Sequence, residues 1–391
     1  MAKILSLLSG KGGSGKTTVA LAMSEVLSES GIKVLLIDCD IATHGATYFF
    51  EPRMTNKREL VSFVDLFSTK YEDVIEKGNS LSKGKHPLII SENFTFIPSV
   101  TQFPYSYSAF SRKVQLKKTL EATHFAYDIV IFDCQAGYSE LLDIIVDASD
   151  VNLLIMEPDA ISSSAIRVLR SQLKSKLSCD NTYLLLSKIT KEENDIYANF
   201  TFENHYTVLP SLIFNWEVRK AFAFAKVPDL SSTNAEFGMN IYQIATVIFD
   251  DYSTVLIKYK EKVLKLEHES KIYELNEVKQ EKKRLRKIQS DRIVSGVFLS
   301  VLTAFIIIAT TIITITQTNV LSLLLSISKN ASPLVLLLAV GVLTCSVLTL
   351  LVLNFRRKVD SNDLQKILQK EKLILAELND QDKTKKTFFR Y

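Results

Sequence analysis

The chain has 391 residues, of which 47% are hydrophobic and 23% are charged, and its formal net charge is +4. This length predicts two or three domain-sized units, while the plentiful apolar residues, with only 12 Gly and 8 Pro, exclude a disordered chain. The small basic excess argues against a protein that tracks DNA, and the four widely spaced cysteines, which form no CxxC pair, argue against a disulfide framework or a zinc site.

Residues 1–250 alternate apolar runs with helical patterns. The clearest apolar runs lie at 4–8, 34–37, 129–132, 151–156 and 183–186. Because these runs are apolar almost throughout rather than at every second residue, they predict strands that are buried on both faces. The alternation of strand and helix predicts an α/β fold, with a mostly parallel twisted sheet covered by helices on both faces.

A glycine-rich loop follows the first apolar run. It reads GKGGSGKTT over residues 10–18, contains the pattern GxxxxGK[ST], and precedes a helical run. Glycines let backbone N–H groups approach phosphate oxygens closely, and the following helix N-terminus adds its dipole. Lys16 would neutralise the β and γ phosphates, and the Thr17 hydroxyl would bind Mg²⁺. The predicted nucleotide-binding residues of the loop are Gly10, Lys11, Gly12, Gly13, Ser14, Gly15, Lys16, Thr17 and Thr18.

Two other apolar runs end in aspartates. Asp38 and Asp40 follow one run, and Asp133 follows another. Acids at the carboxyl ends of strands lie where open α/β sheets bind their ligands. One such carboxylate can hold Mg²⁺ through water, and another can orient an attacking water. Taken singly, each aspartate could equally be a strand-end or helix-capping residue.

Residues 251–292 contain no Gly and no Pro, and they mix Lys and Glu throughout. Apolar residues recur there at spacings of three and four, with one interruption: Leu256, Tyr259, Val263 and Leu266, then Leu275, Val278 and Leu285. The pattern predicts a charged helical stalk with coiled-coil character. A continuous helix of this length would extend about 60 Å.

The mean hydropathy of +0.13 is high for a chain with this charge content, because the apolar residues are concentrated after the stalk. Residues 293–316 and 333–355 are each uncharged and long enough to cross a bilayer. They predict two transmembrane helices joined by a short extracytoplasmic loop, 317–332. Lys and Arg flank the pair on its outer sides, so the positive-inside rule places both termini in the cytoplasm, at the inner membrane. The alternative is a pair of buried core helices.

Residues 356–391 predict a cytoplasmic amphipathic helical tail. Leu364, Leu368, Leu375 and Leu378 fall on one helical face, which Glu371 interrupts. Because a transmembrane hairpin would return the tail to the side of the stalk, one hypothesis is that tail and stalk pair as antiparallel helices. The other is a solvated amphipathic tail.

The glycine-rich loop carries a second lysine, in the form KGGxGK. Further motifs are IDCD at 37–40 and IFDCQAG at 131–137. With the loop, they make residues 1–250 resemble the deviant Walker A P-loop ATPases of the MinD/ParA group. Glu157-Pro158 and the stretch 209–228 are also similar to that group. The resemblance implies a P-loop fold, ATP and Mg²⁺ as cofactors, and a homodimer with nucleotide at its interface.

The resemblance also implies catalytic roles for three residues. Lys11 would reach the nucleotide of the partner subunit, Lys16 would bind phosphate, and Asp40 would position or activate the hydrolytic water. For the metal, it implies that Thr17 binds Mg²⁺ and that Asp38 and Asp133 support its ligand shell. Gly137 would sense the γ-phosphate and would therefore also bind the cofactor.

The chain departs from the group at two places. Gln135-Ala136 stands where a Pro is usual, so the switch loop would move differently. After the predicted strand at 183–186, the group often has an Asn, and this chain has Ser187-Lys188 instead. The residues alone therefore do not decide between adenine and guanine.

Two membrane spans are an effectively irreversible anchor. ATP would then control dimerisation, and with it the recruitment or positioning of an unidentified cytoplasmic or membrane protein partner. Three alternatives have other functions: a polysaccharide-type tyrosine autokinase, although the tail offers only Tyr391; a non-catalytic nucleotide-binding membrane scaffold; and an ATPase for cargo targeting or ion efflux.

Nucleic acid is not an expected partner. Arg167, Arg170, Lys174 and Lys176 on a predicted helix could form a DNA-binding face or an ordinary solvated face.

Overall fold

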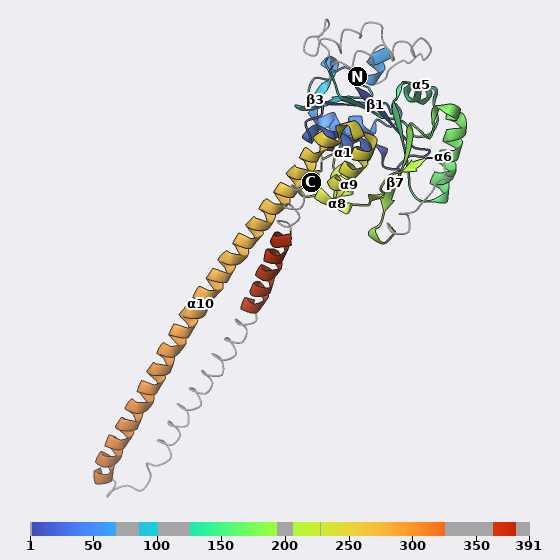
Figure 1. Ribbon diagram of the computed structural model, residues 1–391. Helices are drawn as coiled ribbons and strands as arrows, with labels where there is room; N and C mark the ends of the chain where they lie inside the picture. The colour runs from blue at the N-terminus through green and yellow to red at the C-terminus, as the bar shows by residue number, and fades with distance from the viewer. Residues whose placement is uncertain are drawn as a thin grey trace. The chain divides into compact units, whose positions relative to one another are not determined.

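The computed structural model describes residues 2–67, 86–100, 126–193, 206–226, 228–324 and 363–380. The chain divides into two compact units, residues 1–266 and residues 267–391. Figure 1 shows the strands and most of the helices in the first unit.

The first unit is built on one sheet. Its described strands are β1 (Lys3–Leu8), β2 (Val34–Asp38), β3 (Leu88–Ser91), β4 (Phe94–Ile97), β5 (Ile129–Asp133), β6 (Val151–Met156), β7 (Thr182–Ile189), β8 (Thr207–Val208) and β9 (Leu212–Ile213). They are ordered β3-β4-β2-β5-β1-β6-β7-β8, with β9 also paired to β7. Only the β3–β4 pair is antiparallel among these. The predicted α/β fold with a mostly parallel sheet is confirmed.

Helices connect the strands. They are α1 (Lys16–Glu29), α2 (Gly45–Phe50), α5 (Glu140–Ala148), α6 (Ala160–Leu173), α8 (Trp216–Ala223) and α9 (Ala235–Ile248). Three of them begin at a side chain that accepts a hydrogen bond from the first turn, namely Ser139 for α5, Asp159 for α6 and Asn215 for α8. Such caps satisfy N–H groups that have no partner within the helix, so they set where the helix starts.

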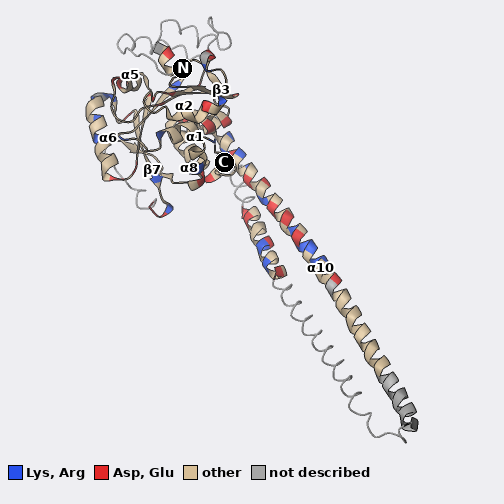
Figure 2. Cartoon of the chain, turned by 180° about the vertical axis from the view of Figure 1, so that it is seen from behind, with Lys and Arg blue, Asp and Glu red and all other residues tan. Residues whose placement is uncertain are grey.

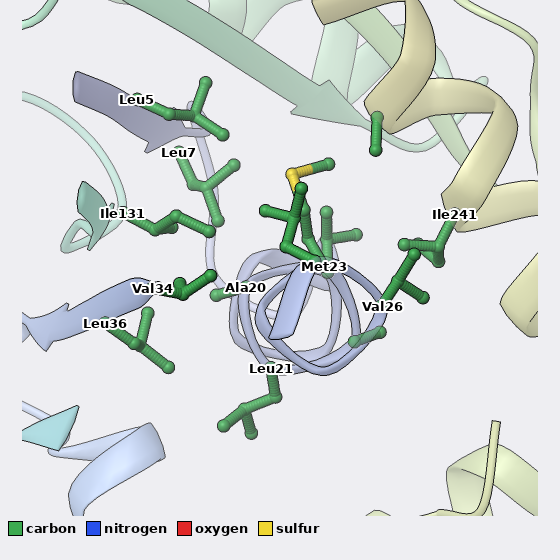
Figure 3. Packing of buried hydrophobic residues seen from close by; sticks show 14 of the residues in the cluster. Leu5, Leu7, Ala20, Leu21, Met23, Val26, Val34, Leu36, Ile131 and Ile241 are labelled. Carbon is green, nitrogen blue, oxygen red and sulfur yellow. The ribbon is translucent and has the colours of Figure 1, made fainter. Parts of the chain in front are cut away.

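The sheet separates two hydrophobic cores because successive side chains of a strand point to opposite faces. In β1, Leu5 and Leu7 pack in the core beneath α1 and α9, while Ile4 and Leu8 pack in the core beneath α5 and α6. Figure 3 shows the first of these cores, with the apolar face of α1 against three strands and Ile241 of α9. Each buried aliphatic side chain contributes about 1.5–3 kcal/mol, and the two cores hold the carboxyl ends of the central strands in register.

Helix α10 (Ser253–Leu324) begins inside the first unit. Leu256, Tyr259 and Val263 are buried in the core that α1 and α9 cover. The Tyr259 hydroxyl donates to the Leu230 carbonyl oxygen at 2.7 Å. A Cβ on Gly238 of α9 would lie less than 3.0 Å from that hydroxyl, so glycine makes room for the ring. The compact unit therefore extends beyond residue 250, to Leu266.

The second unit contains a helix pair. Leu275 and Val278 of α10 are buried against Ile374 of the helix at 363–380. Lys271 pairs with Glu377 at 3.2 Å and Lys282 pairs with Glu371 at 2.5 Å. Residue numbers rise along one helix and fall along the other, so the two helices are antiparallel. The described structure thus favours the hypothesis of stalk pairing over that of a solvated tail.

The contact face of the tail differs from the expected one. Leu378 lies on it, but Leu375 is 41% exposed, and the buried position is Ile374, one residue earlier. Glu371 does not interrupt the face, because its carboxylate pairs with Lys282. An ion pair at that position makes a charged side chain compatible with a partly buried seam.

Beyond the stalk, α10 continues as one helix to Leu324. Residues 317–324, expected in a loop, are therefore helical. Figure 2 shows charges of both signs along the first part of α10, followed by an uncharged part. By length and composition, this helix could span a membrane, and none of its apolar stretch is buried. The expected second span, 333–355, lies outside the described residues.

Candidate functional site

The glycine-rich loop lies between β1 and α1, at the carboxyl edge of the sheet. Gly13 and Gly15 have φ values of 82° and 94°, in the left-handed region that favours glycine. Gly15 precedes the first turn of α1 and no side chain caps that helix. Its first N–H groups are thus oriented toward the space in front of the loop, which suits an anion. The Ser14 hydroxyl in the same loop is buried and has no hydrogen-bond partner among the described residues.

Ser9, the residue before the loop, forms hydrogen bonds with two loop residues and with Gly137. Its hydroxyl donates to the Lys11 carbonyl oxygen at 2.8 Å and accepts from Lys16 Nζ at 2.8 Å. Its carbonyl oxygen accepts from the Gly137 N–H at 2.9 Å. The structure therefore brings Lys16 and Gly137 to one residue that the motif does not include, and no sequence signal singled Ser9 out.

Thr17, in the first turn of α1, contacts Asp133 at the end of β5. The Thr17 hydroxyl donates to Asp133 Oδ2 at 2.7 Å. Asp133 Oδ1 is buried and has no partner among the described residues. Burial raises the pKa of Asp133, while the Thr17 hydrogen bond and the Lys16 charge act in the opposite direction. A hydroxyl beside a carboxylate oxygen that lacks a partner is the oxygen donor set that suits Mg²⁺.

Asp38 is the neighbour of Asp133 across the β2–β5 pair. Its Oδ1 accepts from the Asp40 N–H at 2.9 Å, and its Oδ2 accepts from the Thr47 N–H and hydroxyl at 2.8 and 2.7 Å. Burial, together with the Asp133 charge, raises its pKa. Both oxygens of Asp38 are thus occupied by protein donors, so in this structure it holds the 40–47 loop rather than Thr17.

Asp40 is engaged by its own loop. Its Oδ1 accepts from the N–H groups of Ala42 and Thr43 at 3.1 and 2.8 Å, and its Oδ2 accepts from the Thr43 hydroxyl at 2.6 Å. The loop is also held just beyond the end of β4, because His44 Nδ1 shares a hydrogen bond of 2.8 Å with the Ser99 hydroxyl. Both carboxylate oxygens of Asp40 thus accept hydrogen bonds from its own loop.

The loop is also contacted by residues that follow β6 and by residues near the end of β7. Lys11 Nζ pairs with Asp159 Oδ2 at 3.0 Å. Lys188 Nζ donates to the Gly13 carbonyl oxygen at 2.5 Å and pairs with Glu157 at 2.9 Å. The Ser187 hydroxyl donates to the Ser14 carbonyl oxygen at 2.7 Å. Residues 187 and 188, which depart from the usual Asn, thus contact the phosphate loop itself.

Two of the basic residues considered for a DNA-binding face contact the protein itself. Lys176 pairs with Asp143 and Asp147 of α5 at 2.5 and 3.0 Å. The Arg170 guanidinium lies 5.6 Å from the centre of the Tyr206 ring. These contacts favour the interpretation as an ordinary protein surface.

Known proteins are similar in sequence to part of this chain. Residues 2–185 match the AAA domain family model AAA_31. An uncharacterized ATP-binding protein of Methanocaldococcus jannaschii is 26% identical over 199 residues, which cover 50% of this chain and 68% of that protein. The sporulation initiation inhibitor protein Soj of Bacillus subtilis is 29% identical over 157 residues, which cover 38% of this chain and 56% of Soj.

Solved structures of cell division proteins are also similar. The MinC:MinD complex from Aquifex aeolicus is 18% identical, covering 64% of this chain and 96% of that one, with a TM-score of 0.48. The septum site-determining protein MinD from Pyrococcus horikoshii, complexed with Mg-ADP, is 18% identical, covering 64% of this chain and 98% of that one, with a TM-score of 0.46.

The family match and the loop geometry concern the same residues. The match begins just before β1 and ends in β7, and so includes the loop, Asp38, Asp133 and Asp159. Residues 2–185 are therefore similar to an AAA domain, and Soj and MinD are among the proteins that this chain resembles.

Proposed function

We propose that this protein is a membrane-anchored ATPase switch. ATP-dependent dimerisation and Mg²⁺-dependent hydrolysis would control the recruitment or positioning of another protein at the cytoplasmic membrane. The observation that carries the proposal is the Thr17–Asp133 pair at the P-loop. Its second carboxylate oxygen is buried and has no hydrogen-bond partner among the described residues, and Lys16 and the glycines of the loop lie next to Thr17 in the sequence.

Each residue of the site has its own role in this proposal. Lys16 leaves Ser9 and neutralises phosphate charge, and Thr17 and Asp133 hold Mg²⁺. The metal, when bound, neutralises charge on the phosphate oxygens. Gly137 reports the γ-phosphate through its hydrogen bond to Ser9. Asp40, once released from Thr43, orients the attacking water. Lys11 reaches the nucleotide that is bound to a second copy of the chain.

Exposed apolar side chains near the P-loop support a second copy as the partner of this face. Tyr138, Ile161 and Tyr48 are 44%, 73% and 54% exposed. Tyr138 follows Gly137, which bonds to Ser9, and Ile161 lies two residues after Asp159, which bonds to Lys11. Tyr48 belongs to α2, whose Gly45 lies against Thr17. Large apolar side chains of this kind are typical of interface cores.

The membrane anchor is supported by α10. Its uncharged stretch exposes Val297, Phe298, Val301, Phe305 and Ile308. A helix that is apolar on all sides and unburied suits a lipid environment rather than water. Alkaline carbonate extraction of membranes tests the anchor: the full chain is expected to stay in the pellet, and a chain ending at residue 292 is expected to be released. Release of the full chain would overturn it.

Two variants test the ATPase switch. Asp40→Ala is expected to slow ATP hydrolysis by about 100-fold or more, the usual contribution of a positioned base, and to accumulate ATP-bound dimer. Lys16→Ala is expected to abolish nucleotide binding and the dimer. Crosslinking in membranes with Mg-ATP measures the dimer, and proteins captured only by Asp40→Ala identify the partner. A dimer that forms equally with and without ATP would contradict the proposal.

A further inference from the structure

The ion pair between Lys11 and Asp159 lies within one copy of the chain. Lys11 Nζ and Asp159 Oδ2 are 3.0 Å apart, and the two side chains are 31% and 38% exposed. Lys11 is thus already bound to a carboxylate before any second copy approaches. The neighbouring carboxylate is occupied, since Glu157 pairs with Lys188 at 2.9 Å.

Asp159 is held in place independently of Lys11. It precedes α6, where its Oδ1 accepts from the Ser162 N–H at 2.7 Å and its Oδ2 accepts from the Ser162 hydroxyl at 2.8 Å. The start of α6 is also packed against the P-loop. A Cβ on Gly10 would lie less than 3.0 Å from the backbone of Ala165. Asp159 therefore cannot follow Lys11 if that lysine turns toward another molecule.

We propose that Asp159 is an intramolecular latch for Lys11, which sets the threshold at which ATP-bound copies dimerise. The inference rests on the proposed function, because it requires that Lys11 serve the nucleotide of the second copy. An ammonium group held by Asp159 is unavailable to a phosphate of another chain. Each subunit must open its own latch, so two ion pairs break for every dimer formed.

Because each dimer breaks two ion pairs, even a weak ion pair affects the dimer dissociation constant. A partly exposed ion pair shifts an equilibrium by only a few-fold. Two identical pairs enter the dimer constant as a product, so removing both is expected to strengthen the dimer by about tenfold. The latch does not change the rate of ATP hydrolysis within a formed dimer. It also leaves the affinity of a single subunit for ATP unchanged.

Asp159→Asn tests the latch, since Asn removes the charge but remains a good helix cap. The full-length protein, purified in detergent, carries Asp40→Ala so that ATP is retained. Its dimer dissociation constant at saturating Mg-ATP is measured by mass photometry across protein concentrations. The expected result is a constant about tenfold lower than without Asp159→Asn. Glu157→Gln is the matched control, because it removes a charge from the same loop without freeing Lys11, and it is expected to produce no such gain.

Lys11 provides the decisive comparison. In a Lys11→Ala background, Asp159→Asn is expected to change nothing, because there is no ammonium group to release. A gain that persists without Lys11, or an unchanged or weaker dimer in Asp159→Asn alone, overturns the latch and leaves the proposed function intact. Absence of any ATP-dependent dimer in the parent protein overturns both. Should Asp159→Asn fold poorly, Asp159→Ser also preserves a capping oxygen without the charge and carries the same test.

Discussion

The Thr17 hydroxyl donates to one carboxylate oxygen of Asp133, while the other oxygen is buried without a partner among the described residues. A buried polar atom of this kind costs about 1–3 kcal/mol unless something binds it. The Thr17–Asp133 pair is therefore suited to bind a cation such as Mg²⁺ together with a nucleotide. Binding of a cation to Asp133 Oδ1 would remove that cost.

Substitutions of Thr17 test this arrangement. Thr17→Val keeps the shape and removes the hydroxyl, and it is expected to weaken Mg-nucleotide binding by about tenfold or more, the equivalent of one lost charge-assisted hydrogen bond or ligand. Thr17→Ser keeps the oxygen and is expected to bind normally. Titration of a fluorescent nucleotide with Mg²⁺ and with EDTA measures the effect. Equal Mg²⁺ dependence in the valine variant and the parent would be incompatible with the assignment.

Gly10 is expected to tolerate no side chain. Its Cβ would collide with the backbone of Ala165, so Gly10→Ala must displace either the P-loop or the start of α6. We expect nucleotide affinity to fall by about tenfold or more, because a displaced loop no longer presents its N–H groups together. Gly12→Ala is the control, since a Cβ there meets nothing within 4 Å. Isothermal titration calorimetry with ATP compares the two, and similar losses in both would remove the steric explanation.

Glu25 of α1 predicts a pH dependence of stability. Burial, reinforced by the Glu29 charge, raises its pKa to about 8, whereas an unfolded chain gives about 4.3. The folded state thus keeps a proton that the unfolded state has lost, and stability falls as pH rises from about 4 through about 8. Glu25→Gln is expected to raise the melting temperature at pH 9 but not at pH 4. A gain of the same size at both pH values would show that the carboxyl group is not the cause.

Tyr259 is expected to contribute strongly to the stability of the first unit. Tyr259→Phe removes the donor to the buried Leu230 carbonyl and should destabilise the unit by about 1–2 kcal/mol. Tyr273→Phe, on the same helix but 67% exposed, is the control and should change stability little. Urea unfolding followed by the fluorescence of Trp216 measures both. Equal midpoints for the two variants would contradict the burial argument.

The stalk pairing predicts a difference between two adjacent tail residues. Ile374 is 3% exposed and packs on Leu275 and Val278, whereas Leu373 is 63% exposed. Ile374→Ala should therefore loosen the helix pair by about 2 kcal/mol or more, and Leu373→Ala should not. Limited proteolysis within 267–290 reports the loosening. If neither variant accelerates cleavage, the pairing does not protect the stalk.

Much of the fold follows from local sequence patterns. The runs around Leu5, Leu36 and Ile131 are apolar at almost every position, which is typical of strands that are buried on both faces. The P-loop was predictable for a similar reason, because its chemistry depends on the backbone freedom of Gly13 and Gly15 and on the adjacent Lys16. Short-range constraints of this type are readable from one sequence.

The contacts between distant residues could not be predicted. Asp38 and Asp40 were expected to face the cofactor, yet their oxygens accept hydrogen bonds from Thr47 and Thr43. A carboxylate at the end of a strand can face either the ligand or its own loop, and the sequence does not distinguish between these orientations. Asp159 likewise lies 148 residues from Lys11, and only the fold brings them together.

Helix α1 has a further mechanical consequence. Its first residue, Lys16, lies in the P-loop, and its last, Glu29, pairs with Lys262 of α10 at 2.8 Å. At 14 residues, the helix is about 21 Å long. A tilt of about three degrees about its first turn would move Glu29 by about 1 Å, enough to strain a hydrogen-bonded pair. Helix α1 thus connects the glycine-rich loop directly to the first part of α10.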